Sequence, residues 1–103
     1  MTGITTHVLD TSSGRPAAGI EVQLLRNGQL VAVGVTDGDG RWSALAGPAE
    51  VGPYRLEFAT GPHFRGAAFH PQVTVDFLVR DAAEHHHVPL LLSPFGYTTY
   101  RGS

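Results

Sequence analysis

Three consecutive histidines, His85-His86-His87, form the densest group of proton-transferring side chains in this sequence. On a β-strand, successive side chains point to opposite faces of the sheet. If Val88 and Leu90 face a core, His86 faces it too, and His85 and His87 share the outer face. His87 is then a candidate general acid or base, because imidazole titrates at roughly pH 6.5. A metal site and a solvated strand end remain alternatives, although no H-E-x-x-H or carboxylate spacing supplies further ligands.

A further histidine, His7, lies in a run of alternating residues near the start of the sequence. Ile4, Thr6 and Val8 form one face of this run, which leaves His7 on the other face with Leu9. A lone histidine at such a position is usually structural or merely exposed. A face that carries both a histidine and a leucine, however, indicates a pocket wall or an interface.

A turn with the pattern Asp-Gly-Asp-Gly at residues 37–40 precedes Arg41. It resembles part of a calcium-binding loop, but an EF-hand needs a glutamate at its twelfth position, where this sequence has Pro48. We therefore expect a hairpin turn that delivers Arg41. Its guanidinium is either an ordinary surface charge or a fixed group that holds a carbonyl or an anionic ring. The sequence has no G-x-S-x-G nucleophile elbow and no obvious pair of catalytic carboxylates.

The last four residues, Tyr100-Arg101-Gly102-Ser103, follow directly on a predicted strand. Chain ends are usually frayed and dispensable, and an Arg-Gly-Ser ending can be mistaken for a cloning remnant. Taken alone, the tail predicts no function.

Short runs of alternating residues between turn signals must position these side chains. Asn27-Gly28 is a strong hairpin signal, residues 11–16 are typical of a turn, and residues 61–71 hold at most one helical turn. We expect about eight short strands, at residues 4–10, 19–26, 30–36, 41–45, 54–58, 73–79, 85–92 and 97–101. This pattern predicts an all-β protein built as an antiparallel β-sandwich.

The composition fits one globular domain spanning residues 1–103. A chain of this length buries a modest core, so a sizeable pocket would be shared with another subunit. Seven Lys and Arg against nine Asp and Glu give a net charge of −2, which argues against nucleic acid as a partner. The sequence has no cysteine, no secretory leader and no apolar stretch of about 20 residues. We therefore expect a cytoplasmic protein without disulfides or membrane contact.

Three separated motifs occur in order along the chain. The first is Thr5-Thr6-His7-Val8-Leu9-Asp10-Thr11 with Gly14-Arg15-Pro16-Ala17, the second is Val88-Pro89-Leu90-Leu91-Leu92-Ser93-Pro94-Phe95-Gly96-Tyr97, and the third is the tail. Together they resemble the 5-hydroxyisourate hydrolases, the transthyretin-like enzymes of urate breakdown, over nearly the whole chain. The sequence departs from that family at His86, where an aromatic residue such as tyrosine is expected, and at residues 61–71, which look shorter than usual.

This resemblance implies a prealbumin/transthyretin-like sandwich that assembles as a homotetramer, a dimer of dimers, with active sites where the dimers meet. It implies ring opening of the small-molecule substrate 5-hydroxyisourate by water, which gives 2-oxo-4-hydroxy-4-carboxy-5-ureidoimidazoline, without metal or cofactor. The family's catalytic residues fall on His7, Arg41 and His87. Its substrate-binding residues fall on His7, Arg41, Tyr100, Arg101, Gly102 and Ser103.

Under that resemblance, Arg41 would hold the substrate and polarise the scissile carbonyl. One of His7 and His87 would accept a proton from the attacking water, and the other would orient substrate or protonate the leaving nitrogen. Tyr100 would form a wall, while Ser103 and the terminal carboxylate would order water. Two alternatives remain open: a transthyretin-like carrier without catalysis, whose channel would be apolar or neutral, and a generic β-sandwich module tethered to other domains.

Overall fold

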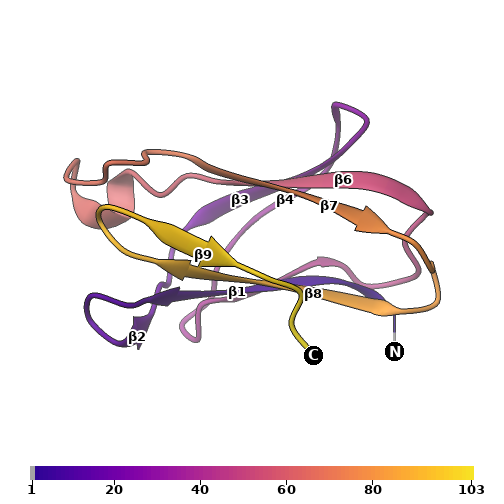
Figure 1. Cartoon of the computed structure of the whole chain (residues 1–103), viewed down its shortest axis with the longest axis horizontal. Helices are drawn as coiled ribbons and strands as arrows, with labels where there is room; N and C mark the ends of the chain where they lie inside the picture. Colours follow the sequence, from indigo (N-terminus) through magenta and orange to yellow (C-terminus); the bar gives the residue numbers. More distant parts are fainter. Residues whose placement is uncertain (1) are drawn as a thin grey trace.

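The computed structural model describes residues 2–103, which form two β-sheets packed face to face (Figure 1). The first sheet contains β1 (Gly3–Asp10), β2 (Arg15–Pro16), β5 (Arg41–Leu45), β8 (His85–Leu92) and β9 (Tyr97–Thr99). The second contains β3 (Glu21–Arg26), β4 (Gln29–Val35), β6 (Gly52–Phe58) and β7 (Val73–Val79). The predicted all-β sandwich is therefore confirmed. Residue 1 of the predicted domain 1–103 lies outside the described residues.

The expected strands agree with the observed ones to within two residues at each end, with one addition. The short strand β2 forms inside the expected turn at residues 11–16 and pairs with the end of β1. The expected last strand ends at Thr99, and beyond it the chain makes a single β-bridge between Gly102 and His87. Residues 61–71 hold one 3₁₀ turn, η1 (Pro62–Phe64), as expected. No helix among residues 2–103 has the length and apolar character needed to cross a membrane.

One strand pair departs from the expected antiparallel pattern. β1 and β8 are parallel neighbours in the middle of the first sheet, although they come from opposite ends of the chain. The register aligns Thr5 with His87 and His7 with Pro89. On its other side β1 pairs with β5 in the antiparallel sense, which aligns His7 with Arg41. Segments far apart in sequence are thereby brought side by side at fixed positions.

The alternation of side chains along each strand builds the core between the sheets. The buried positions recur at every second residue, as expected for strands with one face inward. The side chains that are fully buried include Ile4, Val8, Leu24, Leu56, Phe58, Val73 and Leu90. The residues between the buried ones point outward. On the edge strand β4, these outward residues include Val31, Val33 and Val35, which are exposed.

The Asn27-Gly28 hairpin forms between β3 and β4 as predicted. Both residues have positive φ, 51° at Asn27 and 77° at Gly28. This is the conformation that a two-residue type I′ turn requires, and Asn-Gly is its preferred sequence.

The carboxylate of Asp10 joins the end of β1 to the turn that follows and to η1. It is buried, and it accepts hydrogen bonds from the Ser12 N–H at 2.9 Å, the Ser13 N–H at 3.2 Å and the Ser12 hydroxyl at 2.5 Å. The His63 Nε2 atom lies 2.8 Å from its other oxygen. Burial raises the pKa of Asp10, but the hydrogen bonds from Ser12, His63 and Ser13 together hold it below the usual carboxyl value.

We predict that Asp10→Asn destabilises the protein at neutral pH and matters less in acid. A folded-state pKa below the unfolded one contributes stability that is complete above about pH 4 and is lost as pH falls through the lower folded value. Urea unfolding at fixed protein concentration should show the variant about 1–2 kcal/mol less stable at pH 7. The gap should narrow below about pH 4. A gap that stays constant or widens on acidification would contradict this role of Asp10.

Candidate active site

A polar groove lies on the outer face of β1, β5 and β8, away from the core. Its walls come from these three strands, from the end of β4, from the turn before β5 and from the tail. The residues that line it are Thr5, Thr6, Val35, Asp37, Arg41, Trp42, Ser43, His85, His87 and Ser103.

Strand alternation explains why the histidines of β8 divide between core and groove. His86 is 4% exposed and faces the core, as predicted. Its Nδ1 atom lies 3.1 Å from the Glu84 carbonyl oxygen, so the polar ring has a partner where an aromatic residue was expected. His85 and His87 are half-buried on the outer face.

The predicted hairpin turn does deliver Arg41 to this face. The Asp37 carboxylate accepts hydrogen bonds from the backbone N–H groups of Asp39 at 2.9 Å and of Arg41 at 3.0 Å. Both hydrogen bonds lower the pKa of Asp37 below its usual value, and the bond from the Arg41 N–H has the larger effect. Gly40 has φ +75° and its carbonyl accepts the Val8 N–H at 2.8 Å. A Cβ atom at Gly40 would lie 2.4 Å from the Val8 oxygen, so this position requires glycine.

The backbone of Arg41 is therefore fixed at the groove by pairing with β1 on one side and by the Asp37 turn before it. Arg41 pairs with His7 across β1 and β5, and paired residues on neighbouring strands share a face. Within residues 2–103, the Arg41 side chain makes no ion pair at 4.0 Å or less. It is free to receive an anionic or carbonyl oxygen from a ligand.

His87 is held by a hydroxyl on the adjacent strand. The Thr5 Oγ1 atom lies 2.8 Å from His87 Nδ1 and 2.8 Å from His85 Nε2. The two rings stack with centroids 6.2 Å apart and planes 29° apart. His87 Nε2 has no hydrogen-bond partner among the described residues.

The surroundings of His87 favour its neutral form. Burial has the largest effect and lowers the pKa of the His87 imidazole, and the electrostatic effects of His85, Arg41 and His7 lower it further. A neutral imidazole with an unoccupied nitrogen can act as a general base at neutral pH. Of the predicted trio, Arg41 and His87 line the groove, while His7 is not among its lining residues but lies on the same face as the strand partner of Arg41.

The tail divides between two sides of the molecule. The Gly102 N–H donates to the His87 carbonyl at 2.8 Å, and Ser103 lines the groove. Tyr100 and Arg101 instead line a separate hollow on the open side of the sandwich between β7 and β9. Arg101 Nη2 lies 3.3 Å from the His85 carbonyl oxygen and 3.5 Å from a Glu84 carboxylate oxygen. Tyr100 and Arg101 therefore do not line the groove.

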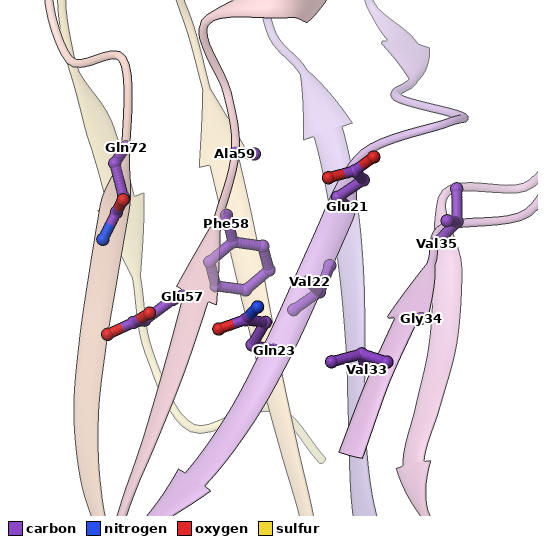
Figure 2. Close-up of a pocket in the computed structure, with 10 residues that line it drawn as sticks. All are labelled: Glu21, Val22, Gln23, Val33, Gly34, Val35, Glu57, Phe58, Ala59 and Gln72. Atoms are coloured by element: carbon purple, nitrogen blue, oxygen red, sulfur yellow. The ribbon is translucent and has the colours of Figure 1, made fainter. Parts of the chain in front are cut away.

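A second hollow, at one end of the other sheet, has a different chemistry. Figure 2 shows the side chains of Glu21, Gln23, Glu57 and Gln72 around it, on β3, on β6 and just before β7. Its ionisable lining is acidic, without histidine or arginine. Nowhere in residues 2–103 do three or more His, Cys, Asp or Glu side chains gather as a metal site would require.

Thr5, His85 and Asp37 also line the groove, although none of them was predicted as a catalytic or binding residue. The signal for Thr5 was available, because it shares the outer phase of the first run with His7. The contact between Thr5 and His87 could not be predicted in this way, because it depends on pairing between strands about 80 residues apart in sequence.

Comparison with known proteins places these residues in a family context. The model of the HIUase/Transthyretin family matches residues 4–102. The chain is 48% identical over 115 aligned residues to the 5-hydroxyisourate hydrolase of Caulobacter vibrioides, with 100% of both chains covered. The structure of Klebsiella pneumoniae 5-hydroxyisourate hydrolase is similar, with a TM-score of 0.87, 38% identity, and coverage of 97% of this chain and 98% of the other. Sea bream transthyretin in complex with thyroxine also resembles it, with a TM-score of 0.85, 30% identity, and coverage of 96% and 93%.

We predict that Gly102→Ala displaces either the tail or the His87 ring while leaving the sandwich folded. A Cβ atom at Gly102 would lie 2.5 Å from His87 Cδ2 and 3.0 Å from Pro89 Cγ, closer than side chains pack. The ring signals of His87 in NMR spectra should therefore shift. Gly47→Ala is the matched control, because its Cβ atom would meet nothing within 4 Å. Unchanged His87 signals in Gly102→Ala would refute the close packing of tail and ring.

Proposed function

This chain belongs to the HIUase/Transthyretin family, and we propose that the groove around His7, Arg41 and His87 is its active site. The chain is a hydrolase that opens the ring of 5-hydroxyisourate, a reaction of urate breakdown. The observation that carries the assignment of the site is that Arg41 and His87 line one groove, with His7 paired to Arg41 on the same face and His87 contacting Thr5.

The chemistry of the groove favours hydrolysis over transport. A carrier of an apolar hormone needs an apolar or neutral channel. Here Arg41 has no ion-pair partner among the described side chains, and His87 has an unoccupied nitrogen. These groups suit a planar heterocycle rich in carbonyl and N–H groups. The alternative of a generic accessory module is set aside, because the family match covers residues 4–102.

In the proposed reaction, Arg41 binds the oxygen of the scissile amide carbonyl and stabilises the negative charge that develops there. His87 Nε2 accepts a proton as the water oxygen bonds to the carbonyl carbon. The ring C–N bond then breaks as His7 supplies a proton to the leaving nitrogen. The carboxylic acid that forms returns its proton to His7 and becomes a carboxylate, and His87 releases its proton to solvent. His87 takes the role of base because its lowered pKa keeps it neutral and Thr5 occupies its other nitrogen.

Each residue of the tail has a separate role in this proposal. Ser103 places a hydroxyl in the groove, where it can order the attacking water. Gly102 binds the His87 carbonyl and allows close packing against its ring. Arg101 supports the site indirectly, through its contact with the His85 carbonyl at the start of β8. Tyr100, which faces away from the groove, belongs to the surface between subunits.

We also propose the homotetrameric assembly, a dimer of dimers, that the family resemblance implies. β7 and β9 are edge strands of their sheets, and their outer backbone groups are open to pairing. Large apolar side chains are exposed beside them: Leu78, Phe95, Tyr97 and Tyr100 are 41–79% exposed. Such edges and patches are typical of surfaces covered by other subunits.

We predict that His87→Ala lowers kcat by about 10²–10⁴-fold, the usual contribution of a general acid or base. The assay is the ultraviolet decay of freshly generated 5-hydroxyisourate, and circular dichroism should show an intact fold. His70→Ala is the control, since His70 contacts Tyr97 edge to face and does not line the groove. Wild-type kcat in His87→Ala would remove His87 from the mechanism. A wild-type protein that does not accelerate the decay would contradict the hydrolase activity itself.

The assembly predicts a molar mass of four chains by light scattering after size-exclusion chromatography. Leu78→Glu and Tyr97→Glu should shift the mass downward, because each places a charge in the proposed interface. A fully active wild-type protein that runs as a single chain would overturn the tetramer and leave the hydrolase assignment standing.

A further inference from the structure

The Thr5 hydroxyl stands between two imidazole rings and contacts both. Its Oγ1 atom lies 2.8 Å from His85 Nε2 and 2.8 Å from His87 Nδ1. The parallel register places Thr5 directly opposite His87 and Gly3 opposite His85. The hydroxyl therefore sits between two ring nitrogens that belong to the same face of β8.

A hydroxyl carries one proton, which limits how this contact can be made. It can donate to one ring nitrogen and must accept from the other. With both rings neutral, one of the two facing nitrogens therefore carries a proton and the other does not. The tautomers of His85 and His87 are coupled through Thr5.

Charge around the groove selects one of the two arrangements. The Arg41 guanidinium on β5 and the His7 ring on β1 lie near His87, and the Asp37 carboxylate is held by the turn before β5. Arg101 and Glu84 lie near the His85 end of the strand. Because Thr5 occupies Nδ1 of His87, Nε2 is the nitrogen left for the surroundings of Arg41. A bare lone pair at Nε2 is more favourable near this cation than an N–H group. His87 then carries its proton on Nδ1 and donates it to Thr5, which donates to His85.

We propose that Thr5 and His85 are positioning residues that hold His87 in its Nδ1-protonated tautomer and share its proton during the reaction. When Nε2 takes a proton from water, the Nδ1 proton passes to Thr5 Oγ1 while the Thr5 proton passes to His85 Nε2. Thr5 gains one proton and loses one, so it stays neutral. His87 also ends neutral, and His85 carries the positive charge. The reverse transfer returns His87 to its starting form. The inference rests on the proposed role of His87 as base.

The test measures two quantities, the tautomer of the His87 ring and the kcat of the enzyme. The ¹⁵N shifts of the His87 ring report directly which nitrogen is protonated, and they do not depend on activity. The wild-type protein should show Nδ1–H at His87, and Thr5→Val should shift the ring toward Nε2–H. In the same variant kcat should fall about 10- to 100-fold, as on losing a partner that orients a functional histidine, while KM changes little. Thr5→Ser should restore both readouts, because it keeps the hydroxyl.

His85→Gln provides a second variant, since an amide can hydrogen-bond to Thr5 but cannot accept its proton. Its kcat should fall, and the acidic limb of its pH–rate profile should shift relative to the wild-type profile. Thr74→Val, on the other sheet, is the matched control for removal of a threonine hydroxyl and should change neither readout. A wild-type His87 protonated on Nε2 overturns the inference, as does an unchanged kcat in Thr5→Val or His85→Gln. An inactive wild-type protein would instead contradict the proposed function, and the ring shifts would still decide the tautomer.

Discussion

The parallel pairing of β1 with β8 determines where each group of the proposed site lies. β1 runs through the middle of its sheet, with β8 on one side and β5 on the other. One register brings Thr5 opposite His87, and the other brings His7 opposite Arg41. Three segments that are distant in sequence thus present their polar side chains to a single face. A slip of one residue in either register would turn these side chains toward the core.

The core prevents that slip. Ile4, Val8 and Leu90 alternate with the groove residues and are fully buried. Each such side chain stabilises the fold by about 1.5–3 kcal/mol relative to exposure, so exchanging the faces would cost several times that amount. His86 belongs to the buried phase of the same strand and is satisfied by the Glu84 carbonyl. The packing that stabilises the sandwich is therefore also what keeps His85 and His87 on the outer face. Because one sandwich can serve hydrolases and a thyroxine-binding protein, the function depends on the residues of that face.

Local patterns were sufficient to predict most of the fold and the faces of the strands. Period-two alternation placed His7 and His87 outside and His86 inside, and the Asp-Gly-Asp-Gly turn placed Arg41 at the start of a strand. These local patterns could not predict which distant strands pair with each other. The parallel neighbours β1 and β8 and the contact of Thr5 with His87 depend on register between distant segments. The division of the tail was also unpredictable, because β9 ends at Thr99 and the bridge at Gly102 then turns Tyr100 and Arg101 away from the groove.

The central claim is that substrate binds on the outer face of β1, β5 and β8. The six histidines of the chain allow a direct test, because three lie on that face and three do not. Urate, which has the fused ring of the substrate but lacks its 5-hydroxyl group, can be titrated into the protein while the histidine ring signals are followed by NMR. The signals of His7, His85 and His87 should move together, and those of His63, His70 and His86 should stay in place. Movement confined to the second group would contradict the assignment of this face as the active site.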